Sequence, residues 1–86
     1  MQYKIVIEKD VVKFLKKHNE ILWKFKHCVS HISQDPLTDF CDTKKLKWLE
    51  DTYRLRIGKR RFLYKVQDDK LIIYFFDAGS RWGVYK

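Results

Sequence analysis

The sequence predicts an α+β fold of the order β-α-α-β-β-β, in which a helical hairpin packs on one face of a mainly antiparallel twisted sheet. Three observations predict it. A short β-rich segment begins the chain, two segments with helical spacing of apolar residues follow, and the C-terminal half alternates apolar and charged residues. Because strands must bury one face, the hairpin is expected to cover the sheet.

Length and charge limit the class of protein. The chain has 86 residues, which we interpret as a single domain spanning residues 1–86. It carries a formal charge of +8 and 45% apolar residues, a composition too apolar for a disordered basic tail. The longest apolar run, Leu71–Phe76, is too short to span a membrane. Such an excess of positive charge indicates an anionic partner, most commonly nucleic acid, then an anionic membrane surface, then an acidic protein.

The N-terminal half is expected to form one strand and two helices. Tyr3–Ile7 is rich in β-formers, and Asp10 is placed to cap the helix that follows. A break at 18–20 separates this helix from a second one, and residues 34–45, which include the only proline, are expected to be an irregular connection. The apolar faces of the two helices are Val11, Phe14, Leu15 and His18, and then Ile21, Phe25, Cys28, Val29 and Ile32.

The C-terminal half is predicted to form a three-stranded antiparallel meander. Gly58 and Lys59 suit a two-residue type II′ turn, so that residues whose numbers sum to 117 face each other. A second turn at Asp68 and Asp69 would pair residues summing to 137. These registers place aromatic and basic side chains together on the face away from the helices: Arg54, Arg56, Arg61, Lys65, Tyr74 and Phe76.

One cross-strand pair of this register has no structural advantage. Arg56 would lie opposite Arg61, and like charges in that position destabilise a sheet. A bound anion would remove the repulsion, because guanidinium groups bind phosphate through two hydrogen bonds and aromatic rings stack on bases. The face is therefore predicted to bind nucleic acid.

The two cysteines indicate neither a metal site nor a disulfide framework. Cys28 and Cys41 fit no metal-ligand spacing, and a reducing cytosolic compartment is the simpler interpretation. His27 and His31 have a spacing that can hold zinc, but Cys28 between them points to the apolar side of the helix. No metal or cofactor is expected.

Residues 44–85 carry a resemblance to a known family. In combination, these motifs resemble the RelE/ParE superfamily, the small basic toxins of type II toxin–antitoxin systems. The motifs are Tyr53-Arg54-Leu55-Arg56-Ile57-Gly58, Arg61-Phe62-Leu63-Tyr64, Asp69-Lys70-Leu71-Ile72-Ile73-Tyr74, Gly79-Ser80-Arg81 and Val84-Tyr85.

For the RelE branch, the resemblance implies a cytoplasmic endoribonuclease that cleaves mRNA in the ribosomal A site. The ribose 2′-hydroxyl attacks the adjacent phosphorus without a metal, which leaves a 2′,3′-cyclic phosphate and a 5′-hydroxyl. The partners implied are the ribosome with its mRNA and an acidic antitoxin that blocks the basic face. No membrane and no small-molecule cofactor are implied.

The family pattern suggests the catalytic residues, whereas the predicted sheet face and the segment before it supply the RNA-binding candidates. The catalytic candidates are Arg54, Arg56, Arg61, Arg81 and Tyr85, and the RNA-binding candidates are Lys47, Trp48, Lys65, Tyr74 and Phe76. Arg56 and Arg61 suit the charge on the phosphorane, and Arg81 the charge on the leaving oxygen. Because arginine is not deprotonated in proteins, it cannot be the general base. Tyr85 is the first candidate for that role, followed by Lys47 and Glu50.

Two other functions remain open at this point. A ParE-like inhibitor of DNA gyrase would act by binding, without nuclease chemistry, and would need no general base. A nucleic-acid-binding module of an unrelated basic α+β family would account for the basic aromatic face alone. Trp23 falls opposite the apolar face of its helix, where it is either a partly exposed residue or a contact for the antitoxin or the ribosome.

Overall fold

The chain follows the predicted order of elements with one strand added. The computed structural model describes residues 2–80, and nearly every expected element lies where the hydrophobic pattern predicts it. A short 3-10 helix, Asn19–Ile21, joins the two α-helices. The other elements are β1 (Lys4–Ile7), α1 (Lys9–Lys17), α2 (Leu22–Ile32), β2 (Asp42–Lys45), β3 (Thr52–Ile57), β4 (Arg60–Gln67) and β5 (Ile72–Gly79).

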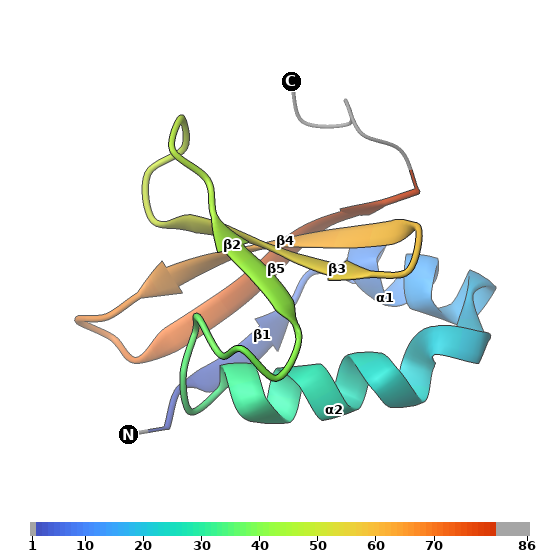
Figure 1. The fold of residues 1–86 in the computed structure, drawn as a ribbon, viewed down its shortest axis with the longest axis horizontal. Coiled ribbons are helices and arrows are strands. Elements are labelled where there is room, and N and C mark those ends of the chain that lie inside the picture. Colours follow the sequence, from blue (N-terminus) through green and yellow to red (C-terminus); the bar gives the residue numbers. More distant parts are fainter. Residues whose placement is uncertain (1, 81–86) are drawn as a thin grey trace.

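The sheet has the strand order β1-β5-β4-β3-β2, with both helices on one of its faces (Figure 1). Only β1 pairs in parallel, with β5, and the other neighbours are antiparallel. The added strand, β2, forms one edge and lies in the segment expected to be irregular, which corrects that expectation. Four polar residues in a row carry little strand signal, and β2 exists because β3 offers it an open edge for backbone hydrogen bonds.

Helix α1 begins one residue before the predicted cap. Glu8 is the N-cap, and its carboxylate accepts a 2.8 Å hydrogen bond from the backbone N–H of Asp10. Asp10 therefore lies in the first turn, where a negative charge still favours the helix dipole. The prediction that Asp10 itself caps the helix was wrong.

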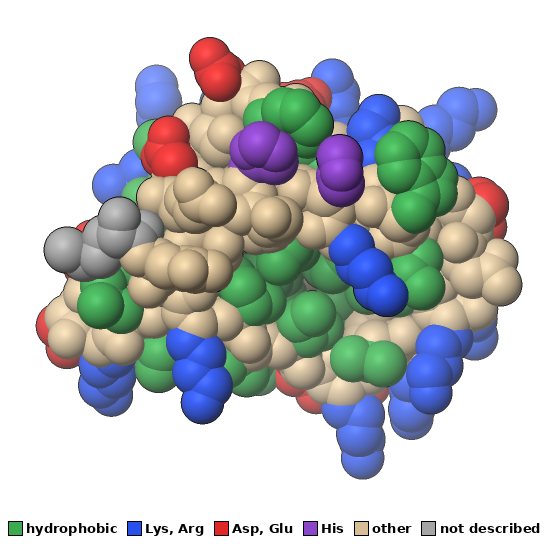
Figure 2. Space-filling model, turned by 90° about the horizontal axis from the view of Figure 1, so that it is seen from below, with side chains coloured by type: hydrophobic (Ala, Val, Ile, Leu, Met, Phe, Trp, Pro, Cys, Tyr) green, Lys and Arg blue, Asp and Glu red, His purple; other side chains and the backbone are tan. Residues whose placement is uncertain are grey.

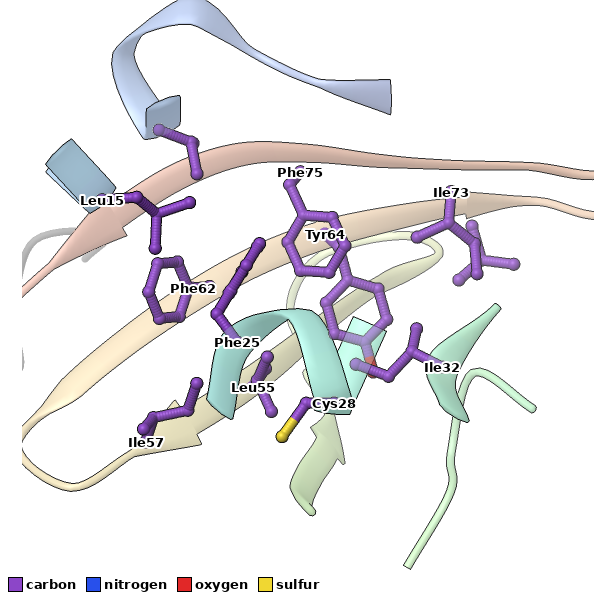
Figure 3. Packing of buried hydrophobic residues seen from close by; sticks show 12 residues of the cluster. Leu15, Phe25, Cys28, Ile32, Leu55, Ile57, Phe62, Tyr64, Ile73 and Phe75 are labelled. Carbon is purple, nitrogen blue, oxygen red and sulfur yellow. The ribbon is translucent and has the colours of Figure 1, made fainter. Parts of the chain in front are cut away.

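The core lies between the sheet and the two helices. Phe25 of α2 packs on Phe62 and Phe75, with ring centroids 4.7 and 5.3 Å apart (Figure 3). Leu15 of α1 and Ile32 of α2 are buried in the same cluster. These residues come from the predicted apolar faces, so the expected covering of the sheet by the helical hairpin is confirmed.

The β3–β4 register is confirmed. Arg56 pairs with Arg61 and Leu55 with Phe62, and the turn contains only Gly58 and Lys59. Gly58 has φ +61°, as the first position of a type II′ turn requires. A positive φ raises the free energy of a residue that has a Cβ atom more than it raises that of glycine.

The β4–β5 register differs from the prediction. Lys65 faces Tyr74, and Arg61 faces Gly79, because the turn spans 68–71 and Phe76 is an extra residue in a β-bulge. The predicted neighbours of Arg61, Leu63 and Lys65 on β5 were therefore wrong. The predicted register rests on a two-residue turn at Asp68 and Asp69, and no pattern in the sequence indicates the bulge.

The cysteine expectation was also wrong. Cys28 of α2 and Cys41, just before β2, form a disulfide with Cα atoms 5.9 Å apart. The thirteen-residue separation hid the pairing, because only the fold brings this connection back against α2. The cysteines therefore no longer argue for a reducing compartment. In the described part of the chain, no helix has the length and apolar character needed to cross a membrane.

Candidate nucleic-acid interface

Three arginines lie on the face of the sheet opposite the helices, but they differ in exposure. Arg54 and Arg61, on the inner strands β3 and β4, are only 9% and 3% exposed, whereas the side chain of Arg56 is 47% exposed. The prediction that all of them lie on an uncovered face was therefore wrong for Arg54 and Arg61. A ligand at the surface meets Arg56 first.

Asp42 is a site residue that sequence reasoning missed. Its carboxylate accepts a hydrogen bond from Arg54 at 2.7 Å and forms an ion pair with Arg56 at 2.9 Å. Asp42 faces Arg56 across the β2–β3 pairing, so this carboxylate follows directly from the unpredicted strand. The sequence predicts that a bound anion offsets the repulsion between Arg56 and Arg61. The Asp42 carboxylate supplies part of that negative charge from within the protein.

A hollow of about 310 Å³ lies beside the Arg56–Arg61 pair. Gly58, Lys59 and Ser80 complete its lining, so the β3–β4 turn and the end of β5 enclose it. Gly79, the partner of Arg61 on β5, adds no side chain over the arginine. The hollow thus offers two guanidinium groups and an ammonium group, which suit a phosphate.

Three of the predicted RNA-binding residues meet in a second hollow, of about 400 Å³. Lys65, Tyr74 and Phe76 line it, and the Tyr74 and Phe76 rings are stacked with centroids 6.3 Å apart. The remaining lining residues, Leu49, Glu50 and Thr52, come from the β2–β3 connection and the start of β3. This surface suits a base that stacks on an aromatic ring beside a cation.

The other predicted residues are only partly brought to this surface. Trp48 is 65% exposed in the β2–β3 connection, and Lys47 lines a neighbouring hollow of about 520 Å³ together with Glu50. Glu50 lines both hollows, which keeps it beside the predicted RNA path. Arg81 and Tyr85 lie outside the described residues.

The tyrosines of the core do not suit proton transfer. Burial raises the pKa of Tyr64 far above its ordinary value, and its hydroxyl donates a hydrogen bond to the carbonyl oxygen of Pro36. The pKa of Tyr53 is raised by burial, and that of Tyr3 by its hydrogen bond to Asp68. A raised pKa keeps these phenols protonated at neutral pH, so they are not general bases.

Comparison with known proteins identifies the family. No family model matches the chain. The Methanocaldococcus jannaschii protein named "Putative toxin RelE1" is 36% identical over 88 residues, an alignment that covers all of this chain and 98% of that protein. The chain belongs to the RelE toxin family. Solved structures of RelE toxins share its fold, so the α+β architecture expected from the resemblance is confirmed.

Two archaeal RelE structures match over most of their length. The toxin in a RelB–RelE antitoxin–toxin complex from Methanococcus jannaschii is 28% identical, with a TM-score of 0.72, covering 93% of this chain and 94% of that one. The toxin in a RelE–RelB complex from Pyrococcus horikoshii is 26% identical, with a TM-score of 0.74, covering 98% and 100%. A mutant Escherichia coli RelE bound to a RelB peptide, 19% identical with a TM-score of 0.79 and covering 96% and 87%, shares the fold.

Proposed function

We propose that this RelE-family chain is a metal-independent endoribonuclease that cleaves mRNA in the ribosomal A site. The observation that supports this most directly is the Arg56–Arg61 pair beside a hollow of about 310 Å³. Two adjacent guanidinium groups are suited to a phosphate whose negative charge rises in the transition state. In the sequence, Arg81 follows Ser80, which lines the same hollow.

In the proposed reaction, the ribose 2′-oxygen forms a bond to the adjacent phosphorus while the bond from phosphorus to the 5′-oxygen breaks. Arg56 and Arg61 stabilise the phosphorane, with Arg54 behind them, and Arg81 stabilises charge on the leaving oxygen. The 2′-hydroxyl proton goes to a base, and the 5′-oxygen gains a proton from water. We assign the base to Tyr85, with Glu50 as the alternative because it lines the neighbouring hollow.

The remaining candidates hold the RNA on either side of the cleaved bond. Lys65 would contact a phosphate, and Tyr74, Phe76 and Trp48 would stack on bases. Lys47 would add charge at the far end of the β2–β3 connection. The stacked arrangement of Tyr74 and Phe76 beside the Lys65 hollow supports this role.

The proposed protein partner is an acidic antitoxin that acts in the cytoplasm. Both archaeal relatives were solved as complexes of RelE with RelB. The formal charge of +8 suits an acidic partner, which would compete with RNA for the arginine face. A partner that binds only the folded toxin would also raise its melting temperature.

Primer extension on mRNA in a purified translation system tests the function. We expect cuts only when ribosomes are present with an empty A site, and their loss in Arg81→Ala and Tyr85→Phe. The absence of cuts with wild-type protein, together with loss of supercoiling by DNA gyrase, would replace the proposal with a ParE-like inhibitor. Cuts in free RNA without ribosomes would contradict the ribosome-dependent step.

A further inference from the structure

A row of exposed rings lies on the face of the molecule away from the arginines. Trp23, His27 and His31 follow one another at four-residue spacing on the outer face of α2, and Phe40 packs beside His27 and His31. Trp23 is 68% exposed and Phe40 is 53% exposed. Figure 2 shows histidine side chains side by side on this face, with hydrophobic side chains close by. We refer to these four residues as the aromatic stripe.

The aromatic stripe is held in place by the fold. The Phe40 ring stacks on His31 with centroids 3.8 Å apart and planes within 14°. The next residue in the chain, Cys41, is bonded to Cys28 of α2, so the disulfide fixes the segment that carries Phe40 against the helix. A ring that is ordered before binding loses less conformational entropy when a partner stacks on it.

The aromatic stripe is continuous with the arginine pair through a hollow of about 500 Å³. Phe40 and Lys24 line this hollow together with Arg56 and Gly58. Arg56 and Gly58 also line the hollow beside Arg61, so one path runs around the β2 edge of the sheet. Asp39 and Asp42 also face the hollow between helix and sheet, and Asp42 is neutralised by its pairs with arginine.

We propose that the aromatic stripe binds unpaired bases of the same RNA strand whose phosphate lies at Arg56 and Arg61. This inference rests on the proposed function, because it extends the RNA path of that site. The chemistry favours RNA over a protein partner. The stripe presents planar rings rather than aliphatic side chains, and the exposed lysines Lys24 and Lys26 flank it on α2.

The length of the RNA provides a test. Fluorescence anisotropy would measure the affinity of two non-cleavable 2′-O-methyl oligonucleotides, a tetranucleotide that reaches only the arginine pair and a dodecanucleotide that also reaches the stripe. The variant Trp23→Leu/Phe40→Leu keeps apolar surface but removes the rings. We expect it to bind the dodecanucleotide at least about fivefold more weakly, as the loss of one base–ring stack implies. Its affinity for the tetranucleotide should be unchanged.

A matched control separates stacking from apolar docking. Leu37, 49% exposed in the loop between α2 and β2, carries no ring, and Leu37→Ala should leave both affinities unchanged. The proposal is overturned if Trp23→Leu/Phe40→Leu binds the dodecanucleotide as the wild type does, or if it weakens both oligonucleotides equally. It is also overturned if Leu37→Ala weakens dodecanucleotide binding as much as Trp23→Leu/Phe40→Leu does, or if that double variant loses only antitoxin binding.

The anisotropy measurement uses non-cleavable RNA, so its outcome does not depend on whether the protein is a nuclease. Suppose that Trp23→Leu/Phe40→Leu weakens only dodecanucleotide binding, but the wild-type protein makes no cuts on ribosomes. This result would contradict the proposed nuclease and leave the stripe as an RNA contact. A protein that cleaves but shows no such effect would contradict only the stripe. Because Trp23 and Phe40 are exposed, the Trp23→Leu/Phe40→Leu variant should melt close to the wild-type temperature, which a thermal scan checks.

Discussion

The carboxylate of Asp42 accepts a 2.7 Å hydrogen bond from the nearly buried guanidinium of Arg54. The same carboxylate pairs with Arg56, so one acidic residue of an edge strand holds two arginines of the proposed phosphate site. The site therefore contains its own partial counter-charge. A phosphate that binds Arg56 at the proposed site would compete with Asp42 for that guanidinium group, which would make Asp42 a determinant of RNA affinity.

Replacing Asp42 by Asn should raise RNA affinity while lowering stability. The change removes a negative charge close to the phosphate, and we expect about threefold tighter binding at low salt, the effect of one unit charge about 7 Å away in water. Because the Asp42 side chain is 43% exposed, loss of its ion pairs should lower the free energy of unfolding by only about 1 kcal/mol. Anisotropy and thermal melts measure the two effects. Asp69→Asn, in the β4–β5 turn, is the charge-matched control, and equal affinities of the two variants would contradict this role.

Arg56→Gln and Arg61→Gln should separate binding from stability. The side chain of Arg56 is 47% exposed, so its variant should melt close to the wild type but bind RNA more weakly, with the slope of log affinity against log salt reduced by about one. Arg61 is 3% exposed, and its replacement should cost about 1 to 3 kcal/mol of stability as well. Lys70→Gln, in the β4–β5 turn, removes one positive charge as a control. A large fall in the melting temperature of Arg56→Gln would contradict the distinction.

Reduction of the Cys28–Cys41 disulfide should destabilise the fold. A cross-link that closes a loop of this length restricts the unfolded chain, and its loss should cost about 3 kcal/mol. Thermal unfolding with and without dithiothreitol measures this, with a thiol assay to show that the bond is reduced. Cys28→Ala/Cys41→Ala should have a lower melting temperature that dithiothreitol does not change. A fully reduced wild type that melts at the oxidised temperature would refute the prediction.

Tyr64→Phe should flatten the alkaline decline in stability. The folded state raises the pKa of Tyr64, whereas the unfolded chain ionises near its ordinary value of about 10. Below that pH both states are protonated and the contribution is complete; above it only the unfolded state loses a proton, so stability falls as the pH rises. At neutral pH the variant should lose about 1 kcal/mol with the hydrogen bond to Pro36. Urea unfolding from pH 7 to 11 should show this gap narrowing, and a constant gap would count against it.

Tyr74→Ala should weaken RNA binding through loss of stacking. Base–aromatic stacking contributes about 1 to 3 kcal/mol per base, so the dissociation constant should rise at least about fivefold. Tyr74→Phe keeps the ring beside Phe76 and should bind within about twofold of the wild type. If both variants lose affinity equally, the hydroxyl rather than the ring carries the interaction.

Local patterns were enough to predict most of the fold. The helical spacing around Phe25 and the alternation around Leu55 both report which side of an element is buried, so they predicted the covered face. The Gly58–Lys59 turn then determined the Arg56–Arg61 pairing, because a two-residue turn leaves no freedom in register. The β4–β5 register was mispredicted because a longer turn and a bulge at Phe76 shift the pairing without a local signal.

The sequence by itself determined the α+β class, the β3–β4 register and the basic aromatic character of the sheet face opposite the helices. The tertiary structure alone decided the rest: strand β2, the Asp42 carboxylate between Arg54 and Arg56, the burial of Arg61, and the disulfide that holds Phe40 beside α2. The physical reason is the range of the interactions. Turns and burial patterns act between near neighbours in the chain, whereas an edge strand, an ion pair and a disulfide form only after distant segments have packed together.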